Sequence, residues 1–174
     1  MTIVRDARRK PMAPVRVTAL RMLARREYSR AELEQRLIAR GAEQHEVTPA
    51  LDDLERRGYL SDARFAQMLV AQKAGRFSKR AIAQAMHVRR VEASAAAGAL
   101  DTVSTADEAA DARALWARRF GAAPRDERER ARQIRFLLAR GYALAIAFDI
   151  VGRPTRSGTE RVDAADGDAI TGVD

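Results

Sequence analysis

A helix-start pattern recurs along the chain and restricts the folds open to it. In Tyr28-Ser29-Arg30-Ala31-Glu32-Leu33, the serine and the glutamate stand at the positions of a capping box, and the tyrosine and the leucine at those of a hydrophobic staple. Phe77-Ser78-Lys79-Arg80-Ala81-Ile82 repeats the staple and the serine. Farther on, Leu137-Leu138-Ala139-Arg140-Gly141 matches the helix end Leu37-Ile38-Ala39-Arg40-Gly41. The spacing, roughly 45–50 residues, predicts tandem helical repeats.

Apolar residues at helical spacing predict three helices in each repeat. We predict an all-α fold of three tandem three-helix repeats, at residues 15–60, 61–103 and 104–152, forming an elongated, somewhat curved array. One compact nine-helix bundle is the alternative. Residues 1–14 are predicted to be a flexible basic arm, and residues 153–174 a disordered tail. The apolar faces expected to be buried in the outer repeats include Val17, Leu20, Leu23, Leu33, Leu37, Ile38, Leu51, Leu54, Trp116, Phe120, Leu144 and Phe148.

Composition supports helices and excludes several classes of site. Hydrophobic residues make up 47% of the chain but aromatic residues only 5%, and small apolar side chains suit closely packed helices. The chain has no cysteine, which excludes disulfides and thiolate chemistry. No apolar run approaches the ~20 residues that a membrane helix needs, and the N-terminus lacks the apolar core of a secretory signal. We therefore expect a cytoplasmic protein.

Three positions break the regular pattern. Pro49 is compatible with a helix only if that helix begins near His45 or later, so that the proline falls in the first turn. Arg90 stands where the other repeats have a helix-ending glycine, so we expect the middle helix of the second repeat to end differently. Gly98 lies in an alanine-rich stretch, and we expect this third helix of the second repeat to be the least stable part of the fold. In the third repeat, Ser104 and Thr105 with Asp107 and Glu108 are the predicted helix cap.

The net charge of +8 concentrates in the second repeat, where residues 61–103 hold seven basic and three acidic residues. We interpret Lys73, Arg76, Lys79 and Arg80, with Arg89 and Arg90 at the far end of the next helix, as the best candidates for contacting phosphates or an acidic partner. A solvated face is the alternative. Arg128, Arg132 and Arg135 form a second candidate stripe, with a salt-bridged exposed helix as an equal alternative. Arg25, Arg26 and Arg30 stand among glutamates, which favours a structural role.

Nothing in the sequence indicates catalysis. His45 and His87 are far apart and lack a second histidine at ligand spacing, so we expect no metal site and no cofactor. No glycine-rich phosphate loop or nucleophile elbow is present. The aromatic residues fall at core or staple positions; for Tyr59 and Tyr142, which follow glycines, packing between repeats is favoured over partial exposure. The chain is predicted not to be an enzyme.

Two segments resemble a known family. Gly58-Tyr59-Leu60-Ser61-Asp62-Ala63-Arg64-Phe65-Ala66, at the join of the first two repeats, is similar to the signature of RecX regulatory proteins, and so is Arg135-Phe136-Leu137-Leu138-Ala139-Arg140-Gly141-Tyr142. The resemblance covers about residues 15–152. Ser61 stands where the family usually has an acidic residue, a small departure because serine also caps helices.

The resemblance implies a regulator that binds the filament of the RecA recombinase on single-stranded DNA. Such proteins lie along the filament groove and suppress its ATPase, strand-exchange and coprotease activities in DNA repair and the SOS response. We expect a monomer that binds single-stranded DNA weakly by itself. A helix-turn-helix-like protein acting on DNA directly is the alternative, although its candidate reading helices show no consistent set of base-reading side chains. A helical adaptor for another protein is a weaker one.

Overall fold

The structure, a computed structural model, describes residues 14–104 and 108–153, and all regular secondary structure in these ranges is α-helical. The first repeat contains α1 (Val15–Leu23), α2 (Arg30–Ile38) and α3 (Gln44–Arg56). The second contains α4 (Asp62–Lys73), α5 (Lys79–Val88) and α6 (Ala93–Asp101), and the third α7 (Glu108–Arg119), α8 (Glu127–Leu138) and α9 (Leu144–Val151). Apart from Pro14 and Arg153, the predicted arm and tail lie outside the described residues, as do Thr105 and Asp107 of the predicted cap.

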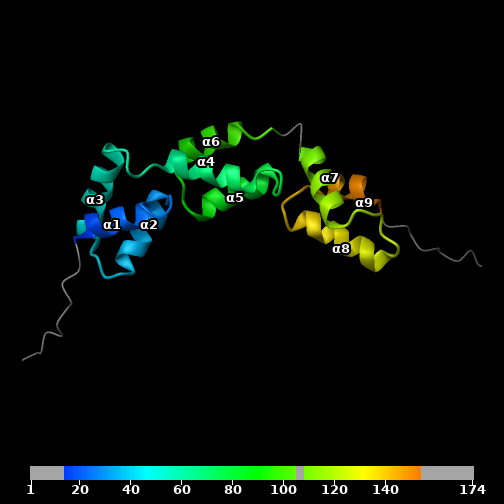
Figure 1. Cartoon of the computed structure of the whole chain (residues 1–174), viewed down its shortest axis with the longest axis horizontal. Helices are drawn as coiled ribbons and strands as arrows, with labels where there is room; N and C mark the ends of the chain where they lie inside the picture. Colours follow the sequence, from blue (N-terminus) through cyan, green and yellow to red (C-terminus); the bar gives the residue numbers. More distant parts are fainter. Residues whose placement is uncertain (1–13, 105–107, 154–174) are drawn as a thin grey trace, which may run out of the picture.

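The three groups of helices follow one another in a gently arched row (Figure 1). Helices that pack closely belong to the same repeat: α1 and α2 pack with α3, α4 and α5 with α6, and α7 and α8 with α9. Each repeat also has its own cluster of buried apolar residues. The all-α array of three-helix repeats is therefore confirmed, and the compact nine-helix bundle is ruled out.

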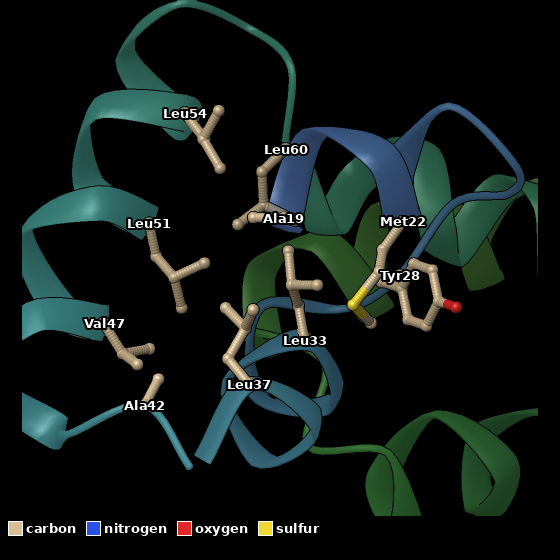
Figure 2. Close-up of a cluster of buried hydrophobic side chains, with 10 residues drawn as sticks. All are labelled: Ala19, Met22, Tyr28, Leu33, Leu37, Ala42, Val47, Leu51, Leu54 and Leu60. Carbon is tan, nitrogen blue, oxygen red and sulfur yellow. The ribbon is translucent and has the colours of Figure 1, made fainter. Parts of the chain in front are cut away.

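The first repeat shows how one such core is built. Leu33 and Leu37 of α2 point toward Leu51 and Leu54 of α3, while α1 adds Ala19 and Met22 (Figure 2). Burying one leucine completely stabilises the fold by roughly 1.5–3 kcal/mol. A three-helix unit thus gains most of its stability from a few aliphatic side chains that its own helices supply.

The buried faces of the short helices are narrower than the sequence predicts. Val17 is 37% exposed, Ile38 41% and Leu144 48%, so their prediction as core residues was wrong. The spacing explains α1, because Val15, Ala19 and Met22 are the residues that turn toward the core. A helix of eight or nine residues with only two packed neighbours buries a thin stripe, and apolar residues at its border stay accessible.

The predicted staples and serine caps form, but the predicted capping box does not. The hydroxyl of Ser29 accepts a hydrogen bond from the Glu32 amide at 3.1 Å, and Tyr28 and Leu33 are buried. The Glu32 carboxylate instead receives hydrogen bonds from Arg26 at 2.6 Å and Arg36 at 3.2 Å. The charge-assisted bonds to two guanidinium groups replace the weaker bond to the helix start.

Pro49 lies deeper in its helix than expected. Helix α3 begins at Gln44, so the proline occupies the sixth helical position, in the second turn. Glu43 and Glu46 form a capping box upstream of it, which fixes the start of the helix there. The helix start near His45 is as expected, but the first-turn position of the proline is not, and the His45 carbonyl loses its usual amide partner.

The middle helix of the second repeat ends in the same way as the others, contrary to the prediction. Arg90 adopts the left-handed conformation with φ of 50°, matching Gly41 and Gly141 with φ of 94° and 84°. The Val91 amide donates to the Met86 carbonyl at 3.1 Å, as the Tyr142 amide donates to Leu137 at 3.3 Å. The helix end requires this hydrogen-bond pattern, so the arginine accepts the strained conformation that glycine adopts freely.

The two tyrosines that follow glycines have opposite environments. Tyr142 is 1% exposed and belongs to the core of the third repeat, whereas Tyr59 is 53% exposed. Burial, followed by the nearby carboxylates of Asp111 and Glu108, raises the pKa of Tyr142 to about 12. Packing between repeats was therefore the wrong interpretation for both: Tyr142 packs within its repeat, and Tyr59 is accessible.

Helix α6 forms despite its featureless sequence. Ala99 is the one buried residue of this helix, and a Cβ on Gly98 would meet nothing within 4 Å. Glu92 caps the helix: the hydroxyl of Ser94 and the amides of Ser94 and Ala95 lower the pKa of the Glu92 carboxyl to about 2. The cap thus compensates for the small buried surface of α6. That α6 is the least stable part of the fold stays a prediction.

We predict that Arg90→Gly stabilises the second repeat. Removing the Cβ from a left-handed residue relieves strain of about 1 kcal/mol, partly offset by the extra entropy that glycine gives the unfolded chain. Thermal and urea unfolding followed by circular dichroism measure the change. Arg89→Gly is the control, because Arg89 has φ of −89° and gains nothing from glycine; equal destabilisation by both substitutions would contradict the explanation.

Candidate functional site

The first and second repeats meet through hydrogen bonds to helix ends. The Ser29 hydroxyl, at the start of α2, donates to the Arg89 carbonyl at 2.7 Å. The Asp62 carboxylate, in the first turn of α4, accepts the Arg30 amide with one oxygen and the Glu92 amide with the other, both at 2.7 Å. A single carboxylate thereby satisfies otherwise unpaired donors at the starts of two helices, α2 and α6.

The second and third repeats meet in a related way. The Ser78 amide, at the start of α5, donates to the Arg140 carbonyl at 3.0 Å. Glu108, in the first turn of α7, accepts a hydrogen bond from the Lys79 amide at 3.2 Å. Asp62 accepts the Arg30 amide in the same way at the first junction. The contact is close: a Cβ at Gly141 would lie 2.6 Å from the Ser78 hydroxyl oxygen, so only glycine fits there without a shift.

These junctions place the middle helices α2, α5 and α8 end to end (Figure 1). The start of α2 meets the end of α5, and the start of α5 meets the end of α8. The positive end of one helix dipole therefore faces the negative end of the next. Residues at the two ends of α5 are consequently brought beside residues of the neighbouring repeats.

At the first junction, four arginines line one groove with a volume of about 580 Å³. Arg89 and Arg90 come from the end of α5, as the sequence predicts, and Arg36 and Arg40 from α2 of the first repeat. Glu32 also lines the groove, but Arg26 and Arg36 hold its carboxylate. Arg36 and Arg40 were not predicted from the sequence, because their proximity to Arg89 arises only from the docking of one repeat on the next.

Lys73, Arg76, Lys79 and Arg80 surround the turn between α4 and α5, on the side of the third repeat. Arg76 and Arg80 are exposed and Lys73 and Lys79 half-buried, with the Lys73 ammonium 4.3 Å from the Phe77 ring centre. Arg118 of α7 approaches the same turn, donating to the Gly75 carbonyl at 3.4 Å. The cluster therefore gains a cation from another repeat, and this neighbour was also not predicted from the sequence.

On α8, the predicted stripe lines a concavity of about 510 Å³. Arg128, Arg132 and Arg135 face it together with Arg125, which precedes the helix. Arg132 pairs with Glu129 at 3.1 Å, and Glu127 pairs with Arg130 instead of the stripe. The alternative of a salt-bridged helix thus holds for Arg132, while the exposed Arg128 and Arg135 take part in no ion pair within the described ranges.

The arginines of the first repeat are mostly engaged in ion pairs, as expected. Arg30 pairs with Asp52 and Glu55, and Arg26 pairs with Glu32. Asp53 lies among Arg16, Arg56 and Arg57, and the hydrogen bond from Arg57 lowers the pKa of the Asp53 carboxyl below its usual value. These charges stabilise the repeat locally and leave little free positive charge there. Arg25 differs, since it is exposed and takes part in no ion pair of the described residues.

Comparison with known proteins identifies the family. Residues 16–54, 61–100 and 106–151 match the first, second and third three-helix domains of RecX, respectively. The chain belongs to the RecX family. The regulatory protein RecX of Leptothrix cholodnii is 42% identical over 137 residues, which cover 79% of this chain and 87% of that relative. The RecX of Ralstonia nicotianae is 38% identical over 143 residues, 82% of this chain and 89% of that relative.

The fold also matches a solved RecX structure. The crystal structure of RecX from Lactobacillus salivarius superposes with a TM-score of 0.62 at 16% identity, over 79% of this chain and 92% of that one. Both segments that carry the RecX resemblance lie at junctions between repeats: one contains Asp62, and the other contains Arg140 and Gly141. Ser61 caps α4 through the Arg64 amide, as expected.

Among the described residues, no helix combines the length and apolarity required to cross a membrane.

We predict that Asp62→Ala loosens the first junction. It removes two hydrogen bonds to a charged acceptor, each contributing roughly 1.5–3 kcal/mol, so the Arg30 and Glu92 amides should exchange hydrogen faster. Hydrogen exchange with mass spectrometry measures both. Asp101→Ala, which removes an exposed carboxylate from the same repeat, is the control. Unchanged protection in the Asp62 variant would contradict the role assigned to this carboxylate.

Proposed function

We propose that this protein binds the RecA recombinase–single-stranded DNA filament and inhibits its ATPase, strand-exchange and coprotease activities. It would act in the cytoplasm as a monomeric, non-catalytic regulator without a cofactor, modulating DNA repair and the SOS response. The family supports a regulatory role, since its members are named regulatory proteins. The observation that carries the proposal for this chain is the distribution of basic groups along the array.

Three basic clusters follow the chain of middle helices from one junction to the next. They are the junction groove at the end of α5, the turn before α5, and the stripe on α8. Arg76, Arg80, Arg89 and Arg90 take part in no ion pair of the described residues, unlike the arginines around Asp53. A row of unneutralised cations on an elongated body suits a polyanionic partner larger than the protein itself.

Filament binding explains how the protein would regulate without covalent chemistry. An array that spans adjacent filament subunits distributes its binding free energy over many weak contacts. If it binds one state of the filament more tightly, it shifts the population toward that state. Extension of the filament or its ATP turnover then falls accordingly.

Direct reading of duplex DNA has less support. The third helices α6 and α9 contain no lysine or arginine, and α3 contains a single arginine, Arg56, among more numerous carboxylates. The starts of α2 and α5, which would have to enter a major groove, are occupied by the junctions, where Ser29 and Ser78 are buried. A gel shift on naked duplex distinguishes the two functions, because tight sequence-specific binding would favour the helix-turn-helix alternative.

The direct test is recombinase activity. We predict that substoichiometric amounts of the protein slow ATP hydrolysis by RecA on single-stranded DNA, since one bound array contacts several filament subunits. A coupled ATPase assay at fixed recombinase and DNA measures the effect. The absence of any effect at saturating protein would refute the proposed function.

We further predict that the triple substitution Arg76→Ala, Lys79→Ala and Arg80→Ala weakens filament binding and flattens its salt dependence. Each lost phosphate contact reduces the slope of log affinity against log salt by about 0.7 for a single strand. Binding to immobilised filaments at several salt concentrations measures this slope. The matched control replaces Arg16, Arg56 and Arg57 with alanine, which removes the same charge from ion-paired positions. Equal losses in both variants would contradict a specific contact.

A further inference from the structure

Two neighbouring concavities on the third repeat combine a basic surface with a partly exposed aromatic ring. The first is the concavity of about 510 Å³ on α8, lined by Arg125, Arg128 and Arg135. The second, of about 300 Å³, is lined by Arg119, Phe120 and Phe136. Both are also lined by Glu129 and Arg132, so the two concavities adjoin.

The aromatic ring that remains available is that of Phe120. The Arg140 guanidinium covers one face of Phe136 at 3.7 Å from the ring centre. The Phe120 ring meets Phe136 edge to face, with ring centres 5.1 Å apart, and the guanidinium groups of Arg119 and Arg132 stay 5.7 and 5.8 Å from its centre. Phe120 is therefore partly exposed, with two guanidinium groups at cation–π distance over its ring, and it is not part of the buried core of its repeat, so its prediction as a core residue was wrong.

The first concavity offers cations at helical spacing, of which Arg132 alone takes part in an ion pair of the described residues. Arg125, Arg128, Arg132 and Arg135 are three or four residues apart and face one side of α8. The two carboxylates that line it are already engaged, because Asp126 accepts the Glu129 amide at 2.7 Å and Glu129 accepts from Arg132 and from the Arg125 amide. From Arg128 to Arg135 the helix rises by about 10 Å, so the stripe can contact more than one phosphate.

We propose that the third repeat carries a subsite for single-stranded nucleic acid, in which Arg125, Arg128 and Arg135 bind backbone phosphates and Phe120 stacks on a neighbouring base. A basic surface alone would suit a duplex or an acidic protein equally well. An aromatic ring beside that surface favours a single strand, because only unpaired bases present a free π face. The subsite is expected to be tolerant of sequence, since every base can stack.

The subsite deepens the proposed function, because it gives the single-stranded DNA of the filament a defined place on the chain. The test of the subsite needs no recombinase, so the subsite and the proposed function can be refuted separately. If oligonucleotide binding does not depend on Phe120 while the protein still inhibits the recombinase ATPase, the subsite alone is overturned. If Phe120 contributes to DNA binding but the protein has no effect on the ATPase, only the proposed function is overturned.

The test measures binding of the full-length chain to two labelled strands of equal length by fluorescence anisotropy. One strand is oligothymidine, and the other is an abasic strand that keeps the phosphates and lacks the bases. We expect Phe120→Leu, which keeps an apolar side chain against Phe136, to weaken oligothymidine binding about tenfold and to leave the abasic strand unaffected. Phe120→Trp should restore the affinity for oligothymidine.

Two further variants separate the roles of charge and ring. The pair Arg128→Ala and Arg135→Ala should weaken binding of both strands and reduce the salt slope by about 1.4. Tyr59→Leu changes an exposed aromatic of the first repeat and should alter neither strand, which makes it the matched control.

Three outcomes would overturn the subsite. The first is that the unaltered protein binds neither strand at low salt. The second is that Phe120→Leu leaves oligothymidine binding intact or weakens both strands equally. The third is that Phe120→Leu weakens binding of the DNA-free recombinase and not of the oligonucleotide, which would assign the aromatic concavity to a protein partner.

Discussion

The array depends on how the ends of its middle helices are satisfied. A helix start leaves backbone amides without intrahelical partners, and here the next repeat supplies the acceptors: Asp62 for Arg30 at the first junction, and Glu108 for Lys79 at the second. Because these hydrogen bonds at the helix ends each have a backbone group as one partner, they align the helices end to end with their dipoles in series. Apolar cores hold each repeat together, while polar contacts at the junctions set the direction in which the next repeat continues.

This division of roles explains where the free positive charge lies. A helix end that docks on a neighbouring repeat brings its flanking side chains close to that neighbour, so both ends of α5 lie beside cations of other repeats. Arg89 and Arg90 meet Arg36 at one end, and the turn holding Gly75 meets Arg118 at the other. Clusters of like charge are costly inside a compact fold, but an extended array keeps them in water, where they are screened and available to a partner.

Local patterns in the sequence were enough to predict the repeats, the staples and the serine caps, because these depend on residues three to five positions apart. The sequence could not predict the second partner of Ser29, which lies sixty positions away at the Arg89 carbonyl. Nor could it predict that Arg36 lies near Arg89, since the spacing of apolar residues does not indicate which face of one repeat packs on the next. The first-turn position expected for Pro49 failed for a related reason, as the carboxylates of Glu43 and Glu46 set the helix start upstream.

Arg90 shows how one position can serve the fold and the surface at once. The left-handed turn there ends α5 so that the Arg89 carbonyl can receive the Ser29 hydroxyl. Glycine would allow the same turn with less strain, as it does at Gly141, but it would leave the junction groove with one cation fewer. Since strained residues persist where the surrounding structure holds them in place, the hydrogen bonds around this turn offset the strain and keep a charged side chain at the groove.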